Sequence, residues 1–174
     1  MYKIVLILFL ALSLFSKEKL DEKQYETHQV LVEGLVINKL TLNVAELAKL
    51  SGVKTGETPV ICMSGETKEN VQSYEGVRLT TILDKAMIQT EKKSDFNKIY
   101  VQVIASDAYE VIFSYNELFN TKNGENVIVF YKKNGKLLEP SEGKIALIST
   151  DDIKTGPRHI RWLEKIVVKK IDLH

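Results

Sequence analysis

The last part of the chain, TDDIKTGPRHIRWLEKIVVKKI at residues 150–171, places polar and aromatic side chains directly before an apolar run. The run EKIVVKKI at residues 164–171 is rich in Val and Ile and predicts a strand. If the chain is also extended after Pro157, side-chain alternation places Arg158, Ile160 and Trp162 on one face of this segment. The residues between them would then share the opposite face.

The polar residues before the strand suit a flat, anionic ligand. Guanidinium groups donate hydrogen bonds in a planar fork, and a tryptophan ring stacks on flat molecules. The residues leave a second interpretation open, in which this is a surface loop whose half-buried Trp162 anchors the last strand. The side chains concerned are Asp151, Asp152, Arg158, His159, Arg161 and Trp162.

Further strands are predicted upstream by segments rich in Val, Ile and Tyr. VLVEGLVI, residues 30–37, is interrupted by Gly34, which indicates a bulge or a close approach of another backbone. Asn134-Gly135 predicts a hairpin, and Asn123-Gly124 marks another turn. The remaining predicted strands cover residues 98–106, 109–113, 126–132 and 144–149.

Short helices are predicted at three places. Asn43 with Glu46 three residues later has the pattern of a capping box, and Gly52 is expected to end that helix. A second helix is expected over residues 80–86, and a third after Ser114. Strands dominate and do not alternate regularly with helices, so the sequence predicts an α+β or β-rich fold with a mostly antiparallel or mixed sheet.

The first residues predict export. Residues 1–16 combine one lysine with an apolar run that is too short to span a bilayer, as in a cleavable signal peptide. We therefore expect a periplasmic or secreted protein, with a polar N-terminal arm at residues 17–29 and one domain at residues 30–171. The formal charge of the whole chain is +1, which gives no electrostatic reason to expect a nucleic acid partner.

Cys62 is the only cysteine, so the fold has no internal disulfide. It follows the apolar run TPVI, where a lone cysteine is more often a small buried residue than a metal ligand. Zinc is largely excluded, because the three histidines at positions 28, 159 and 174 form no ligand pair with helical or knuckle spacing. The chain also lacks a G-x-S-x-G elbow, a G-x-G-x-x-G motif and a P-loop.

The segment SDAYEVIF, residues 106–113, predicts a turn between two strands. Asp107 and Ala108 form the expected turn, and Tyr109 begins the second strand. Tyr109 is either a cross-strand packing residue, which base rates favour, or a phenol directed into a pocket.

Taken in order, these segments resemble the oxidoreductase molybdopterin-binding domain, the sulfite-oxidase fold, over nearly all of residues 30–171. The resemblance runs through VEGLVINKLTLNVAELAKL, YEGVRLTTILDKA and ASDAYEVIFSYNEL, and ends with NGKLLEPSEGKIALIS and GPRHIRWLEKIVV. The last piece is similar to the family's Gly-x-Arg-x-Val-Lys-Trp-Leu ending. Ala108 stands where the family has Gly, Tyr74 stands where it usually has Trp, and we expect the upstream part of the cofactor cradle to be missing.

The resemblance implies a molybdenum ion held by a pterin dithiolene and one cysteine, which performs oxygen-atom transfer. Cys62 falls near the position of that metal ligand, and Arg158 and Arg161 match positions that hold the pterin phosphate and ring. An enzyme of this kind is one prediction, and a scaffold domain without a small ligand is another.

The signal peptide favours a third prediction. It carries no twin arginines, and a chain exported unfolded does not carry a cofactor with it. Some small exported relatives that this chain resembles use the fold as a receptor for a metal-free pterin. We therefore predict a pterin-binding protein that signals to a membrane-bound partner, with a site formed by Asp107, Tyr109, Asp152, Arg158, His159, Arg161 and Trp162.

Overall fold

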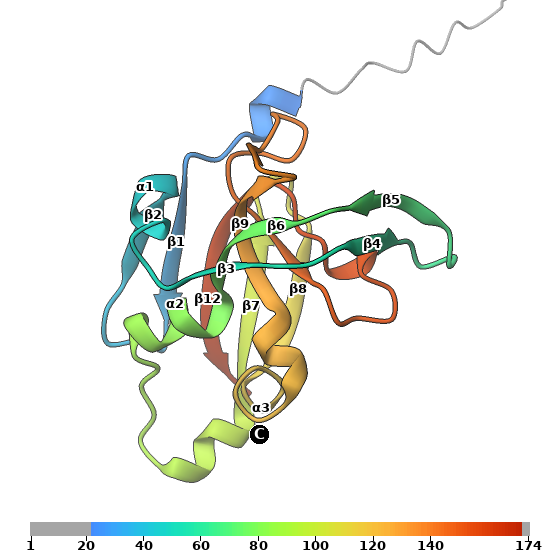
Figure 1. Ribbon diagram of the computed structural model, residues 1–174. Coiled ribbons are helices and arrows are strands. Elements are labelled where there is room, and N and C mark those ends of the chain that lie inside the picture. The colour runs from blue at the N-terminus through green and yellow to red at the C-terminus, as the bar shows by residue number, and fades with distance from the viewer. Residues whose placement is uncertain (1–21, 172–174) are drawn as a thin grey trace, which may run out of the picture.

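The computed structural model describes residues 22–171, which form two five-stranded sheets and a projecting two-stranded hairpin (Figure 1). The first sheet contains the C-terminal strand near its centre. Its order is β2 (Leu40–Asn43), β1 (Gln29–Gly34), β12 (Leu163–Lys170), β7 (Ile99–Ala105) and β8 (Glu110–Ser114). Only the β1–β12 pair in this sheet is parallel, so the predicted mixed sheet is confirmed.

The second sheet is built around β9, and a separate hairpin extends beyond it. The sheet has the order β10 (Lys136–Leu137), β9 (Val127–Lys133), β6 (Tyr74–Arg78) and β3 (Gly52–Lys54), and β11 (Ala146–Ser149) also pairs with β9. The hairpin of β4 (Thr58–Ile61) and β5 (Thr67–Val71) projects to the right in Figure 1.

The predicted close approach at Gly34 is confirmed. Its φ is +93°, and a Cβ atom there would lie 2.1 Å from the carbonyl oxygen of Val168 on β12. A side chain at this position would therefore collide with the neighbouring strand, which explains the glycine inside an otherwise apolar strand.

The short helices begin where the sequence predicts. They are α1 (Val44–Leu47), α2 (Leu79–Ala86) and α3 (Tyr115–Phe119). Asn43 and Glu46 form the predicted capping box, and Ser114 and Glu117 form a second one at α3. Single 3-10 turns add η1 (Glu22–Tyr25), η2 (Lys93–Lys98), η3 (Lys122–Asn126) and η4 (Gly156–Arg158).

One expectation about local structure is wrong, and two strands were not predicted. Gly52 does not end α1, which stops at Leu47; instead Gly52 begins β3 and pairs with Val77. The polar residues Thr67–Val71 form β5, and Tyr74–Arg78 form β6 before α2 begins. β5 forms by pairing with its hairpin neighbour β4, whereas β3 and β6 pair with strands more distant in sequence, and in each case this pairing outweighs the weak local pattern.

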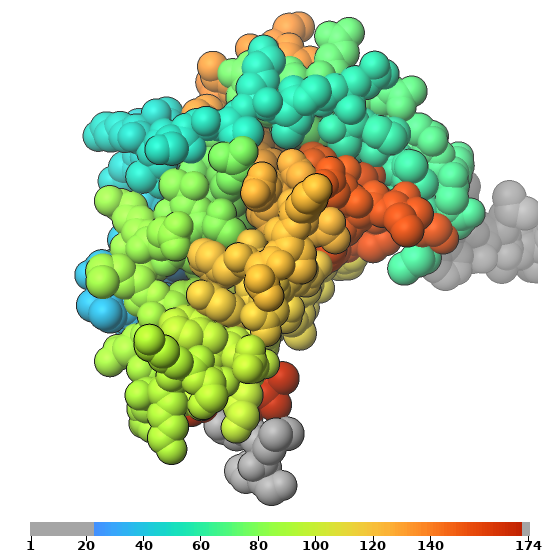
Figure 2. All heavy atoms as spheres, turned by 60° about the horizontal axis from the view of Figure 1, so that its bottom comes forward, coloured from blue at the N-terminus to red at the C-terminus, as the bar shows by residue number. Residues whose placement is uncertain are grey.

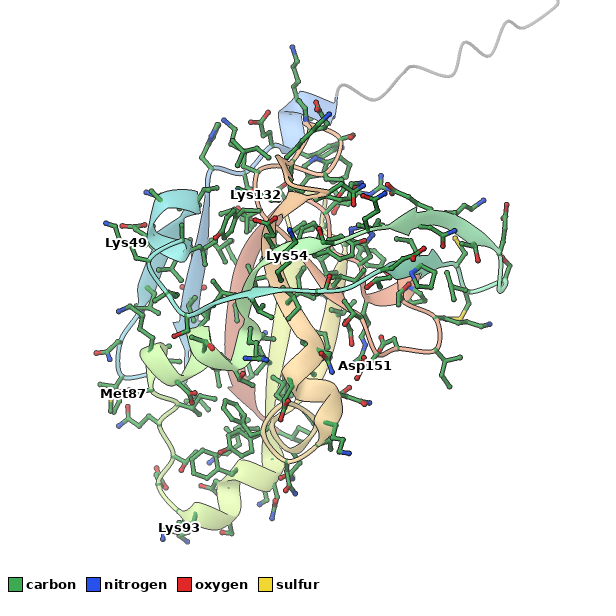
Figure 3. The ribbon with its side chains drawn as sticks, in the orientation of Figure 1. Lys49, Lys54, Met87, Lys93, Lys132 and Asp151 are labelled. Carbon is green, nitrogen blue, oxygen red and sulfur yellow. The ribbon has the colours of Figure 1, made fainter. Side chains whose placement is uncertain are left out.

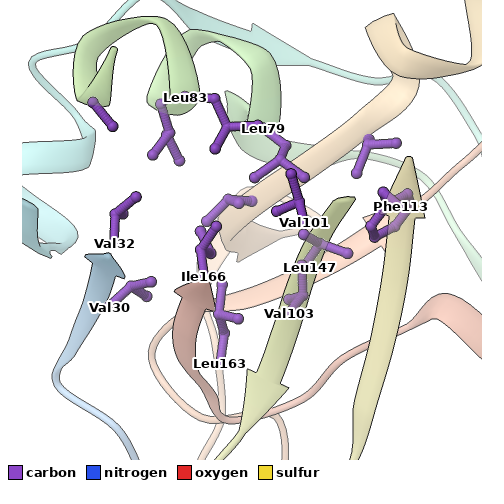
Figure 4. Close-up of a cluster of buried hydrophobic side chains, with 14 of the residues drawn as sticks. Val30, Val32, Leu79, Leu83, Val101, Val103, Phe113, Leu147, Leu163 and Ile166 are labelled. Atoms are coloured by element: carbon purple, nitrogen blue, oxygen red, sulfur yellow. The ribbon is translucent and has the colours of Figure 1, made fainter. Parts of the chain in front are cut away.

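The core lies between the faces of the two sheets and under α2. Figure 4 shows Val30 and Val32 of β1, Leu79 and Leu83 of α2, and Leu147 of β11, together with residues of β7 and β12. Alternate residues of β7 are buried, as expected for a strand with one face on the core. Because Leu163 and Ile166 of β12 belong to this core, the segment just before β12 is held by a rigid strand.

The described part of the N-terminal arm lies against the domain. Thr27 Oγ1 donates a hydrogen bond to the carbonyl of Leu163 at 2.8 Å, and the rings of Tyr25 and Trp162 are 5.4 Å apart. The predicted signal peptide, residues 1–16, lies outside the described residues. Within residues 22–171, no helix has the length and apolar character needed to cross a membrane.

Candidate functional site

The segment before β12 lies between the hairpin and α3. In Figure 2 the orange-red segment around residues 150–157 lies between the golden α3–η3 region and the teal hairpin region. Asn126 of η3 donates a hydrogen bond to Asp151 at 2.6 Å, and Figure 3 labels Asp151 on this segment. On the other side, Thr155 Oγ1 accepts from the Ile61 amide at 2.9 Å and donates to the Pro59 carbonyl at 2.7 Å.

Cys62 lies at the start of the hairpin turn, beside this segment. A Cβ atom on Gly156 would lie 2.8 Å from the Ile61 carbonyl oxygen and 3.4 Å from the Cα of Cys62, so only glycine allows this approach. The Cys62 side chain is half-buried, and its backbone bonds to Glu66 and Gly65 within the turn. Cys62 is therefore outside both clusters of buried apolar residues.

Arg158 is held by two carboxylates and an aromatic ring. Its Nε and Nη2 donate to Asp152, its Nη1 donates to Glu117 at 2.6 Å, and its guanidinium lies 4.5 Å from the ring centre of Phe113. The hydrogen bonds to Asp152 and then to Glu117 raise the pKa of Arg158, with burial opposing them. Two predicted site residues, Asp152 and Arg158, are thus paired with each other.

The chain after Pro157 is not a regular extended segment, so the condition for shared faces is not met. Gly156–Arg158 form the 3-10 turn η4, and Trp162 has a φ of +50°. Ile160 forms a bridge with Leu147 and is fully buried. Regular alternation is lost, so Arg158 and Trp162 do not share a face, whereas His159, Arg161 and Trp162 line one pocket.

This pocket, which we call the aromatic pocket, also contains the turn between β7 and β8. It is lined by Asp107, Tyr109, His159, Arg161 and Trp162 and has a volume of about 220 Å³. Five of the seven side chains predicted to bind a pterin are therefore brought together. They come from two segments about fifty residues apart in the sequence.

Local geometry fixes the β7–β8 side of the aromatic pocket. Asp107 Oδ1 accepts a hydrogen bond from the Tyr109 amide at 2.9 Å, and Ala108 between them has a φ of +69°. The Tyr109 hydroxyl donates to the Pro157 carbonyl at 2.8 Å, although the side chain is 48% exposed. Tyr109 is consequently a pocket residue that also ties this turn to η4.

The opposite side of the aromatic pocket provides a cation and a ring. The Trp162 indole donates to the Pro140 carbonyl at 2.8 Å, which fixes the ring. Arg161 is exposed and makes no ion pair or side-chain hydrogen bond with residues 22–171. A carboxylate, a guanidinium group and two aromatic rings thus face a small volume, as recognition of a flat polar molecule requires.

Behind the aromatic pocket lies a buried charged cluster that the sequence did not reveal. Glu142 is only 7% exposed, and it contacts Lys133 Nζ and lies 3.7 Å from His159 Nε2. Burial alone would raise the pKa of the Glu142 carboxyl, but the neighbouring N–H groups of His159 and Lys133 outweigh it and lower the pKa to about 2. Glu142 is in a turn, and no sequence pattern marks a turn glutamate as buried.

A second, more open hollow lies on the other side of η4. Its volume is about 630 Å³, and its lining includes Met63, Ile153, Lys154, Pro157 and Arg158. The Tyr109–Pro157 hydrogen bond lies between this hollow and the aromatic pocket. The two spaces are therefore neighbours, and Met63, which lines the larger one, follows Cys62 in the sequence.

With this geometry established, comparison with known proteins identifies the family. The family model described as the oxidoreductase molybdopterin binding domain matches residues 17–173. The chain belongs to this family. Its members take their name from binding molybdopterin, and the β-rich fold with few helices described above is the sulfite-oxidase-like fold of that family.

A solved structure agrees with this assignment. The sulfane dehydrogenase SoxCD from Paracoccus pantotrophus matches with a TM-score of 0.58 and 16% sequence identity, over 88% of this chain. The match covers 40% of the SoxCD chain, and at this identity it shows a shared fold alone. A search of curated proteins finds no match.

The family implies a molybdopterin cofactor. The residues of this chain suit the pterin ring of that cofactor better than its phosphate. The aromatic pocket offers donors, acceptors and rings that suit a pterin ring. Arg158, expected to hold the phosphate, already uses three N–H groups on Asp152 and Glu117. No group of three or more His, Cys, Asp or Glu side chains gathers within residues 22–171, so Cys62 would be the single protein ligand of a metal.

Proposed function

We propose that this domain binds a pterin-type ligand in the aromatic pocket and acts as an exported pterin receptor. The observation that carries the proposal is the convergence of Asp107, Tyr109, His159, Arg161 and Trp162 around one space. The volume of about 220 Å³ is below the ~300–1,000 Å³ typical of drug-sized ligands, and so favours one fused bicycle over a complete cofactor.

The groups in the aromatic pocket match the edges of a pterin. The 2-amino group and N3–H of a pterin donate hydrogen bonds, and the second carboxylate oxygen of Asp107 is available to accept them because Oδ1 holds the Tyr109 amide. The pterin carbonyl accepts, and Arg161 is an unpaired donor among the described residues. Trp162 and Tyr109 provide aromatic surfaces for the ring.

The proposed location and partner follow from the N-terminal sequence. A signal peptide without twin arginines directs an unfolded chain through the general secretory route, so the ligand is met after export. A receptor in the periplasm reaches the cell interior through a membrane-bound partner protein, which is the proposed recipient of the signal.

Cys62 supports a second candidate, a molybdopterin-dependent oxidoreductase. Cys62 is half-buried, its Cα lies close to Gly156, and the adjacent Met63 lines the larger hollow. In this reading Cys62 holds the metal, while Arg161 and Trp162 hold the pterin ring. When bound, the molybdenum centre would supply oxygen-atom transfer.

Titration calorimetry with a tetrahydropterin tests the receptor proposal. Arg161→Ala removes a donor from the aromatic pocket and should weaken binding about 10–100-fold, the loss expected for one charged hydrogen bond. Lys169→Ala is the matched control, because it removes an exposed cation at the far end of β12 and should leave affinity unchanged. Absence of binding to the folded wild-type protein would overturn the proposal.

Cys62→Ser separates the two candidates. The receptor reading predicts that its pterin affinity equals that of the wild type, because Cys62 does not line the aromatic pocket. The oxidoreductase reading predicts loss of bound molybdenum and of activity.

A further inference from the structure

We propose that Glu142 is a positioning residue that fixes the protonation of the His159 ring, so that the aromatic pocket selects a reduced pterin over an oxidised one. This inference rests on the proposed pterin-binding function and adds which oxidation state of the pterin the pocket prefers. Glu142 itself does not line the pocket and acts through His159.

The first observation is a concentration of buried polar atoms without partners. Four buried side-chain N or O atoms among the described residues lack a hydrogen bond, and three of them are Tyr74 Oη, Glu142 Oε2 and His159 Nε2. Unpartnered buried polar atoms are rare in folded proteins, and a group of three requires a physical reason. These three side chains contact one another behind the wall of the aromatic pocket.

The second observation is the orientation of the His159 ring. Its Nε2 lies 3.7 Å from Glu142 Oε2, and its side chain is 6% exposed. Phe130 and Tyr74 pack on the ring at centroid distances of 5.9 and 6.4 Å, which hold its plane. The ring cannot reverse without moving this packed aromatic group.

The carboxylate then selects the tautomer. An ionised carboxylate only accepts hydrogen bonds, and the contact with the Lys133 ammonium keeps Glu142 ionised. An Nε2 lone pair directed at this carboxylate would be repelled, whereas an Nε2–H is attracted even at 3.7 Å. In the neutral ring the proton therefore resides on Nε2, and Nδ1 carries the lone pair.

This tautomer determines what His159 offers to a ligand. His159 lines the aromatic pocket beside Arg161 and Trp162, and with Nε2 directed at Glu142 the ring has Nδ1 left as the acceptor that it can offer to a ligand. Tetrahydropterins carry N–H groups at N5 and N8, which can donate to Nδ1. Oxidised pterins have lone pairs at the same positions, so the two acceptors repel each other.

The first test uses the free protein and needs no pterin. The ¹⁵N chemical shifts of the His159 ring at neutral pH, assigned with His159→Gln, should show Nε2–H and a bare Nδ1. Glu142→Gln should shift the ring toward a mixture of tautomers. Glu139→Gln is the control, because it removes an exposed carboxylate from the same turn and should leave the tautomer unchanged. A wild-type ring with the proton on Nδ1 would overturn the inference even if Glu142→Gln fails to fold.

The second test compares a tetrahydropterin with the oxidised pterin that carries the same substituent. Wild type should bind the reduced form at least about 10-fold more tightly, and Glu142→Gln should reduce this ratio toward one. Binding of both forms with equal affinity would overturn the inference and leave the proposed function standing. Failure of the folded protein to bind either form would overturn both.

Discussion

At the scale of single residues, Arg158 shows how a side chain that looks like a ligand donor can be committed to the fold. Its guanidinium joins Asp152, just upstream in its own segment, to Glu117 of the α3 capping box and covers Phe113. The Arg158 side chain is 21% exposed, and the side chains of Asp152 and Glu117 are 13% and 28% exposed. Removing the arginine would leave both carboxylates without their main partner.

Arg158→Ala should therefore lower the free energy of unfolding by about 2–3 kcal/mol, since breaking a buried ion pair leaves uncompensated charge. Urea unfolding measures this as a lower midpoint with an unchanged slope. Lys68→Ala is the control, because it breaks an exposed Lys68–Glu66 pair and should change stability by less than about 0.5 kcal/mol. Equal effects of the two substitutions would contradict the structural role of Arg158.

Sequence patterns predicted which residues gather in the candidate site better than they predicted the contacts of those residues. The types and positions of Asp107, Tyr109, Arg161 and Trp162 pointed to a polar aromatic site, and they line one pocket. The sequence does not show that Arg158 faces Asp152 and Glu117, because Glu117 is 41 residues away and its role as a helix cap gives no sign of a second partner. Glu142 was missed for a similar reason, since its contacts with Lys133 of β9 and with His159 arise only in the folded chain.

At the scale of elements, the β4–β5 hairpin depends on the segment before β12. Thr155 bonds to both Pro59 and Ile61 of β4, and Lys154 Nζ donates to the Met63 carbonyl in the turn. The hairpin forms a sheet of its own, and two-stranded sheets are marginally stable without such support. The position of Cys62 relative to η4 is therefore set by Thr155 and Gly156.

Thr155→Val should release the hairpin without unfolding the domain. It removes two hydrogen bonds at nearly constant volume, and it should increase amide exchange of the hairpin, residues 58–71, and accelerate alkylation of Cys62 severalfold. Thr67→Val, an exposed position in the same hairpin, should leave both measurements unchanged. Unchanged Cys62 alkylation in Thr155→Val would show that the anchor does not control the thiol.

Elements with strong local signals were predictable, whereas an element that forms only through pairing with another strand was not. The caps at Asn43 and Ser114 and the Asn134-Gly135 hairpin carry their own chemistry in adjacent residues. β5 consists of Thr-Lys-Glu-Asn-Val, which has little strand propensity and forms because β4 lies opposite.

At the scale of the whole molecule, the family fold places two neighbouring spaces on either side of η4. The aromatic pocket contains five of the side chains proposed to bind a pterin, and Met63, next to Cys62 in the sequence, lines the more open hollow. β12 lies in the core and fixes the segment before it, which lines both spaces. The Tyr109–Pro157 hydrogen bond joins this segment to the β7–β8 turn. The order of segments in the sequence was enough to predict this fold, whereas the division into two spaces depends on side-chain contacts.

The most direct test of a metal-free pterin receptor is native mass spectrometry of the protein purified from the envelope of its own cells. Molybdenum-loaded, pterin-loaded and empty protein differ in mass and are resolved in one spectrum. We predict a species with a bound pterin and no molybdenum, in which Arg161→Ala reduces the pterin-bound fraction. Stoichiometric molybdenum, lost on replacement of Cys62 by Ser, would contradict the account and establish the oxidoreductase instead.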